Sequence, residues 1–258
     1  MPPRMLSLFS GIGGLDLAAE WAGIETVAFC ERDGFCKQVL AKHWPGVPIH
    51  DDVRTLRGSD IAGPVDIVAG GYPCQPFSTA GEQRGAGDER HLWPDMLRLV
   101  RDLQPAWVVG ENVVGHIALG LDAVLGDLEA EGYAARAFCI PACSVGARHK
   151  RERVFVVANR PDRIRRAQPG SVAGSEGQGC GEARGGQVRQ GLRGAGNGGP
   201  ATRGEPDGWK QWGAEPGMGR VVRRASRWVD RHRAIGNVVV PQQIAPIFYG
   251  ISSTYNVV

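Results

Sequence analysis

Residues 5–21 read MLSLFSGIGGLDLAAEW, and this stretch decides which class of fold the chain can adopt. The apolar run Met5–Phe9 is typical of a buried strand, and a glycine turn at residues 10–14 follows it directly. Glycine lets the backbone approach a ligand closely, and a helix that begins after such a turn presents free N–H groups. The stretch therefore predicts a strand, a ligand-binding turn and a helix to about Trp21, with a plain turn as the alternative.

The alternation of strand-like and helix-like segments continues to about residue 160. Strands are expected at Thr26–Cys30, Val47–Ile49, Val65–Ala69, Trp107–Val109, Ala137–Ile140 and Val154–Ala158, and helices at Phe35–His43, Leu92–Leu103 and Leu121–Glu131. Alternation of this kind is typical of a doubly wound, Rossmann-like α/β sheet with helices on both faces.

This pattern ends in a glycine-rich segment. Residues 170–199 contain 12 glycines in 30 positions and few large aliphatic side chains, so they bury too little apolar surface to offset the entropy of ordering. Packed segments resume near the C-terminus. We therefore expect a first domain at 1–160, a short and partly disordered region at 161–220, and a segment at 221–258 that returns to the first domain.

The net charge of +3 is the sum of an acidic N-terminal part and a basic C-terminal part. Residues 148–258 carry 19 Lys and Arg against 8 Asp and Glu, whereas residues 1–147 carry 11 against 19. This asymmetry indicates a C-terminal part that faces a polyanion, with a solvated basic tail as the alternative. No apolar run approaches the roughly 18 residues of a membrane helix, and no secretory signal is recognised, so a cytoplasmic protein is expected.

The chain has six cysteines without the spacing of a small secreted domain. Reduced thiols are therefore expected, as in cytoplasmic proteins. Cys139 and Cys143 could pair or bind a metal, but partly buried core thiols are the favoured interpretation.

Acidic residues follow the second and third expected strands. A carboxylate such as Glu31, at the end of a second strand, can accept hydrogen bonds from both ribose hydroxyls of a nucleoside. Asp52 could accept one from an adenine amino group. Together with the glycine turn they describe an adenosine-type pocket. The turn reads FSGIGG and lacks the GxGxxG spacing, so a nicotinamide oxidoreductase is disfavoured.

A thiol and a carboxylate are expected at the same edge of the sheet. In GGYPCQPFS at 70–78, Cys74 lies just beyond a buried strand, between prolines that stiffen the loop. A nucleophilic cysteine would need nearby positive charge to ionise, and a buried structural cysteine is the alternative. Glu111, directly after the strand that begins at Trp107, could donate a proton or hydrogen-bond to a ring nitrogen.

Two arginines precede the expected strand Val154–Ala158, in the run KRER at 150–153. If this run is part of the strand, Arg151 and Arg153 lie on one face, because side chains alternate along a strand. They would then form a paired cationic clamp, with an ordinary charged strand start as the alternative.

Taken in order, these motifs closely resemble those of the DNA (cytosine-5) methyltransferase family. They are FSGIGG at 9–14, CERD at 30–33, GGYPCQPFS at 70–78, ENV at 111–113, KRERVF at 150–155 and GNVVVP at 236–241. They extend over the chain apart from roughly 160–205. The resemblance implies a Rossmann-like methyltransferase sheet, S-adenosylmethionine as cofactor, and a small, glycine-rich target-recognition region at 161–220.

The resemblance also implies roles for individual residues. Cys74 would attack carbon 6 of a flipped cytosine, so that carbon 5 takes the methyl group, and Arg153, with Arg151 nearby, would contact the carbonyl oxygen of the base. The cofactor would contact Phe9, Ser10, Gly11, Gly13, Gly14, Leu15, Glu31, Arg32, Asp52, Val53, Asn237 and Val238. DNA would contact Gln75, Ser78, Arg220, Arg227 and Arg231, and no metal is expected.

Glu111 would contact ring nitrogen 3 and the amino group of the base. To be a resident acid at pH 7, its pKa would have to rise from about 4.3 to about 7, which corresponds to roughly 3.7 kcal/mol. A hydrogen bond that strengthens as the covalent adduct forms is less demanding and is the favoured role.

The chain departs from the family pattern in two places. His149 stands where the family often has glutamine, and the short recognition region favours relaxed specificity or a short target. Double-stranded DNA is the expected substrate, a cognate restriction endonuclease is a candidate partner, and monomeric action is expected. A tRNA cytosine-5 methyltransferase of the same family remains an alternative. So does a catalytically idle DNA-binding relative, which the intact set of Cys74, Glu111 and Arg153 disfavours.

Overall fold

A computed structural model describes residues 1–73, 92–160, 162–163, 236 and 238–255 of the chain. Within these residues one seven-stranded sheet has the order β3-β2-β1-β4-β5-β7-β6. The strands are β1 (Arg4–Leu8), β2 (Glu25–Cys30), β3 (Ile49–His50), β4 (Ile67–Gly70), β5 (Trp107–Val113), β6 (Ala134–Pro141) and β7 (Glu152–Asn159). β1 to β5 are parallel, whereas β7 runs antiparallel to both β5 and β6. The predicted α/β sheet is confirmed.

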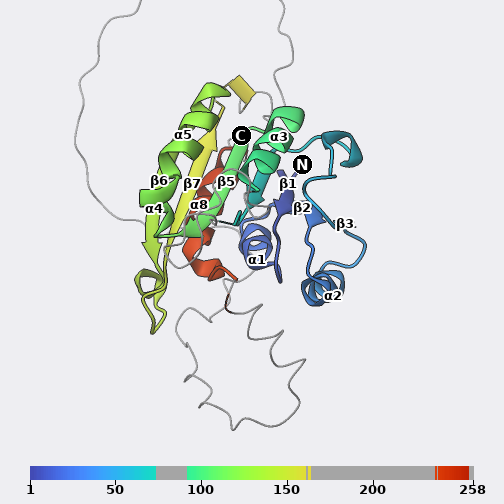
Figure 1. Ribbon diagram of the computed structural model, residues 1–258. Helices are drawn as coiled ribbons and strands as arrows, with labels where there is room; N and C mark the ends of the chain where they lie inside the picture. Colours follow the sequence, from blue (N-terminus) through green and yellow to red (C-terminus); the bar gives the residue numbers. More distant parts are fainter. Residues whose placement is uncertain (74–91, 161, 164–235, 237, 256–258) are drawn as a thin grey trace, which may run out of the picture.

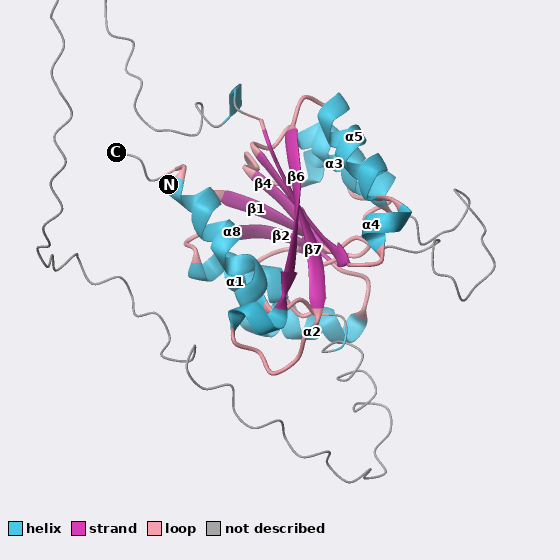
Figure 2. Cartoon of the chain, turned by 90° about the vertical axis from the view of Figure 1, so that its left-hand side faces the viewer, coloured by secondary structure: helices cyan, strands magenta, loops and turns pink. Residues whose placement is uncertain are grey.

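Helices cover both faces of the sheet (Figure 2). The described helices are α1 (Gly14–Trp21), α2 (Gly34–His43), α3 (Trp93–Leu103), α4 (His116–Leu119), α5 (Leu121–Ala130) and α8 (Pro241–Ser253). Short 3-10 turns are η1 (Gly58–Asp60) and η3 (Ala142–Val145). α1 and α8 lie on one face and α3 and α5 on the other, while α2 lies near the edge of the sheet formed by β3 (Figures 1 and 2). No described helix has the length and apolar character to cross a membrane.

Two apolar cores form because each strand sends alternate side chains to opposite faces. One core joins Leu6 and Val108 of the sheet to Leu97 of α3. The other joins Met5 of β1 to Phe248 of α8, which comes from the far end of the chain. The C-terminal helix is therefore part of the same packed unit as the first strand.

Two expectations about the antiparallel edge are wrong in detail. β5 continues to Val113, so Glu111 lies within a strand and not after it, because β7 pairs with β5 along its full length. β7 begins at Glu152, so Arg151 lies before the strand, with a φ of 30°. The two arginines therefore do not share one face of a strand.

The expectation of partly buried thiols at Cys139 and Cys143 is also wrong. Both residues are exposed and neither forms a disulfide. Cys30 and Cys36 are buried free thiols, and burial raises the pKa of each to about 12. In the part of the chain that the structure describes, no group of three or more His, Cys, Asp and Glu side chains could hold a metal.

Candidate active site

The turn after β1 is shaped by three residues with positive φ. These are Phe9 at 53°, Gly11 at 54° and Gly13 at 86°. The Gly11 N–H donates to Glu31 Oε2 at 2.7 Å, and the Asp33 N–H donates to Glu31 Oε1 at 2.7 Å. Glu31 therefore ties the turn after β1 to the backbone after β2. Because each carboxylate oxygen has two lone pairs, it can still accept hydrogen bonds from a ligand.

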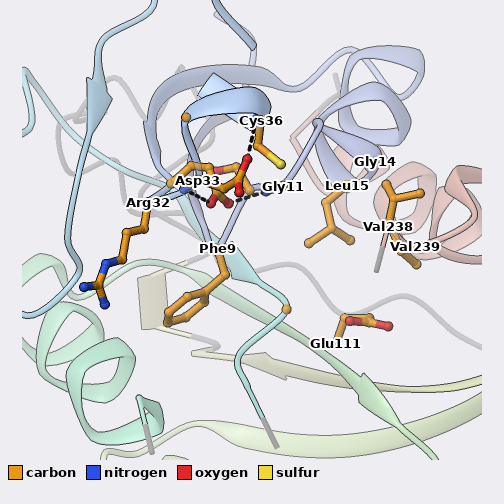
Figure 3. A pocket seen from close by; sticks show the side chains of 14 residues that line it. Phe9, Gly11, Gly14, Leu15, Arg32, Asp33, Cys36, Glu111, Val238 and Val239 are labelled. Atoms are coloured by element: carbon orange, nitrogen blue, oxygen red, sulfur yellow. Dashed lines mark hydrogen bonds between the residues drawn. The ribbon is translucent and has the colours of Figure 1, made fainter. Parts of the chain in front are cut away.

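A cavity of about 700 Å³ opens beside this turn (Figure 3). The residues predicted to bind cofactor that line it are Phe9, Ser10, Gly11, Gly14, Leu15, Glu31, Arg32 and Val238. Glu111 lines the same cavity. Sequence reasoning missed the lining residues Asp33, Gly34, Cys36, Gly71 and Val239. Asp33, Gly71 and Val239 lie within the quoted motifs and Gly34 follows one directly, so membership of a motif is the signal that could have found them.

A second hollow of about 270 Å³ shares Phe9, Glu31 and Arg32 with the first and is also lined by Asp52 and Val53. The Asp52 carboxylate accepts hydrogen bonds from Arg54, from Nε at 3.0 Å and from Nη2 at 2.6 Å. These bonds hold the pKa of Asp52 at about 2, so it is an anion at neutral pH. The two hollows together offer a nucleoside-sized cleft with acceptors at Glu31 and Asp52.

The C-terminal segment closes the cavity on the side of α1. A Cβ placed on Gly14 would lie 2.5 Å from Val238 Cγ2 and 2.9 Å from the Val239 carbonyl oxygen, so only glycine permits this approach. Gly13 does not line the cavity: its Cα faces Trp44, whose ring would lie 2.5 Å from a Cβ. Its absence of a side chain lets the turn pack against Trp44, and its expected contact with the cofactor stays a prediction.

Glu111 forms a buried ion pair with Arg153. Arg153 Nε lies 2.8 Å from Glu111 Oε1, and the side chains are only 14% and 13% exposed, respectively. Burial raises the pKa of Glu111, and the positive charges of Arg153 and Arg151 partly oppose this shift. A Cβ on Gly71 would lie 2.9 Å from Glu111 Oε2, so the carboxylate packs directly against the backbone of Gly71.

Arg151 binds a different part of the chain from Arg153. Its Nη2 donates to the carbonyl oxygens of Gly236 at 2.9 Å and Val238 at 2.6 Å. In return, Gln243 Nε2 of α8 donates to the Arg151 carbonyl oxygen at 3.0 Å. Arg151 therefore docks the C-terminal segment beside the cavity, while its charge still acts on Glu111.

The remaining predicted site residues lie outside the described residues. They are Cys74, Gln75, Ser78, Arg220, Arg227, Arg231 and Asn237. Pro73, which precedes Cys74, lines the second hollow. The described part of the GGYPC motif thus runs along the edge of the cleft, next to Glu111.

The model of the C-5 cytosine-specific DNA methylase family matches residues 3–177, which is more than half of the chain. The chain belongs to this family. The match includes the glycine turn, the GGYPC motif, Glu111 and both arginines of the KRER run.

Individual relatives agree with this family membership. The chain is 34% identical over 164 residues to the Type II methyltransferase M.FnuDI of Fusobacterium nucleatum, covering 62% of this chain and 47% of that protein. It is 34% identical over 168 residues to M2.BsuMI of Bacillus subtilis, covering 60% and 42%. The chain therefore spans less than half the length of these two curated relatives. Among solved structures, DNMT2 of Spodoptera frugiperda shares the fold, with a TM-score of 0.54 at 23% identity over 66% of this chain and 52% of that one.

Proposed function

We propose that this member of the cytosine-5 DNA methylase family transfers a methyl group from S-adenosylmethionine to carbon 5 of a flipped cytosine in duplex DNA. The observation that carries the proposal is the buried Glu111–Arg153 pair, whose carboxylate packs against Gly71 at the rim of a nucleoside-sized cavity. Gly71 precedes Cys74 by three residues. The reaction requires a thiol close to such a carboxylate and cavity, and we propose that Cys74 supplies it.

The cavity fits the cofactor in size and in chemistry. Glu31 has the acceptors for ribose hydroxyls, Asp52 and Val53 border the hollow suited to adenine, and Val238 closes the far side. S-adenosylmethionine supplies an electrophilic methyl group on a sulfonium sulfur.

The proposed chemistry begins with the thiolate of Cys74. Its sulfur would form a bond to carbon 6 of cytosine, and the electrons of the 5–6 double bond would make carbon 5 the nucleophile that takes the methyl group. The bond between the methyl group and the sulfonium sulfur would break, leaving S-adenosylhomocysteine. Glu111 hydrogen-bonds ring nitrogen 3 and the amino group, and it shares a proton more strongly as nitrogen 3 becomes basic in the adduct. Loss of the carbon-5 proton to a base would then re-form the double bond and release the sulfur of Cys74.

Arg153 has two tasks in this scheme. It orients Glu111 through the 2.8 Å ion pair, and it would present positive charge to the carbonyl oxygen on carbon 2 of cytosine. Because the target atom is inaccessible inside a duplex, the base must first be flipped, at a cost of a few kcal/mol. Since the relatives are named Type II methyltransferases, a cognate restriction endonuclease is the partner we propose.

The test is incubation with labelled S-adenosylmethionine and duplex DNA, followed by mapping of the methylated positions. Wild-type protein and Cys143→Ser, which alters an exposed free thiol, should both label cytosine at carbon 5, and Cys74→Ser should not. DNA with 5-fluorocytosine at the target should form a covalent adduct through Cys74, because fluorine blocks the final elimination. Activity of Cys74→Ser at the wild-type rate would refute the mechanism, and labelling of tRNA in place of DNA would refute the substrate.

A further inference from the structure

Tyr72, two residues before Cys74, is buried and contacts residues of α3, α4 and β5. It is 3% exposed, its hydroxyl lies 3.0 Å from His116 Nε2 in a buried hydrogen bond, and its ring packs against Trp93 with centroids 5.0 Å apart. Its carbonyl oxygen accepts a hydrogen bond from Asn112 Nδ2 at 3.1 Å. A Cβ on Gly110 would lie 2.9 Å from Tyr72 Cε1, so glycine there makes room for the ring.

These contacts connect the loop that leads to Cys74 with β5, residue by residue. Gly70 pairs with Gly110 in the sheet, Gly71 packs against the Glu111 carboxylate, and Asn112 binds the carbonyl of Tyr72. The strand that carries Glu111 therefore also determines where the backbone before Cys74 runs. Tyr72 itself lines neither hollow of the cleft, although its neighbours Gly71 and Pro73 each line one, so its side chain acts on the loop and not on a ligand directly.

His116 of α4 supplies the hydrogen bond to the Tyr72 hydroxyl, whereas Trp93 of α3 packs against the ring. It is 6% exposed, at the start of α4, and its ring packs edge-on against Tyr72 with centroids 5.4 Å apart. Burial lowers the pKa of His116, which favours the neutral ring. Its Nδ1 has no hydrogen-bond partner among the described residues, so the pairing with Tyr72 is the polar interaction that holds this imidazole.

We propose that Tyr72 and His116 are positioning residues for methyl transfer: their buried hydrogen bond keeps the backbone before Cys74 in register with Glu111. The inference rests on the proposed function, since it takes Cys74 as the nucleophile. A thiol displaced from its attack geometry loses rate in the chemical step, while the cofactor site, built from other residues, keeps its affinity.

The variant that tests this inference is Tyr72→Phe, which removes the hydroxyl and keeps the ring. The matched control is Tyr133→Phe, because Tyr133 is also 3% exposed and its hydroxyl donates to the Pro105 carbonyl oxygen at 2.9 Å, away from the cleft. We expect Tyr72→Phe to lower kcat about tenfold with KM for S-adenosylmethionine within about twofold of wild type, since small displacements of reacting groups cost rate. Tyr133→Phe should lose comparable thermal stability and leave both constants within about twofold. Equal kcat values in the two variants would overturn the inference.

His116 is tested through its coupling to Tyr72. His116→Leu should lower kcat as Tyr72→Phe does, and the double variant should be no slower than either single one, because both break the same bond. His116→Gln, whose amide reaches the position of Nε2, should restore part of the loss. Additive losses in the double variant, or no restoration by Gln, would show that the two residues act separately.

Chemical labelling of Cys74 tests this inference without requiring methyltransferase activity, and so separates it from the proposed function. The rate at which iodoacetamide labels Cys74, read by peptide mass, should differ from wild type in Tyr72→Phe and not in Tyr133→Phe. If wild-type protein fails to methylate DNA, the proposed function fails, and this labelling rate still decides whether Tyr72 positions the thiol. Equal labelling in all three proteins would refute that role.

Discussion

Arg153→Met removes the positive partner of Glu111 while keeping a long apolar stem in the same place. The pair is 2.8 Å long and both side chains are about 14% exposed or less, so it behaves as a buried ion pair. Removing one partner of such a pair costs about 3–5 kcal/mol, because the remaining charge is buried without compensation. We expect about 3 kcal/mol near neutral pH, at the lower end, because Arg151 still acts on Glu111.

The cost should depend on pH in a defined direction. Burial raises the pKa of Glu111 above its ordinary value of 4.5, so the native state binds the proton more tightly than the unfolded state. Below pH 4.5 both states are protonated and no penalty exists, whereas the penalty grows as the pH rises through the native pKa. Without Arg153 the native pKa rises further, so the variant should lose more stability at about pH 8 than at about pH 5.

Urea unfolding at these two pH values measures the effect. The control is Arg101→Met, which breaks an ion pair with Glu131 of 2.6 Å in which the arginine is 52% exposed and should cost less than about 1 kcal/mol. Replacing Glu111 with Gln in the Arg153→Met background removes the buried charge and should recover most of the stability. An equal loss at both pH values, or no recovery in the double variant, would refute the idea that a buried, uncompensated carboxylate is the cause.

Three further predictions concern the cleft and its support. Gly14→Ala should weaken S-adenosylmethionine binding at least about tenfold in calorimetry, because the new Cβ would lie 2.5 Å from Val238 Cγ2; unchanged affinity would contradict this packing. Arg151→Met should speed amide exchange in α8, since it removes the bonds to Gly236 and Val238, and unaltered exchange would show that other contacts hold the helix. Asp16 is fully buried and its pKa is raised from 3.8 to about 6, so its contribution to stability falls as the pH rises through this range. Asp16→Asn should gain about 2 kcal/mol relative to wild type between pH 4 and 6 in thermal melts, and a pH-independent difference would exclude this origin.

The sequence by itself determined the class of fold and the composition of the cleft. Glycines that permit positive φ, an acidic residue at a strand end and apolar runs of strand length are local properties, because each depends on a few neighbouring residues. Gly11 and Glu31 could therefore be assigned to one pocket before any contact was known, whereas Val238 was added by the family resemblance. Asp33 and Val239 lie within the quoted motifs, yet nothing in the local sequence shows that they face the cavity.

Only the tertiary structure decided how the charged groups are partnered. Glu111 and Arg153 are 42 positions apart, and their pairing depends on the antiparallel register of β5 and β7, which local sequence does not specify. Alternation along an assumed strand put Arg151 beside Arg153, yet the strand begins one residue later and Arg151 binds carbonyl groups more than 80 residues away. Burial, which raises the pKa of Glu111, likewise arises from chain segments that meet only after folding. The sequence specifies which residues are present and in what order. The distances between side chains, the register between strands and the burial of each group are properties of the folded chain.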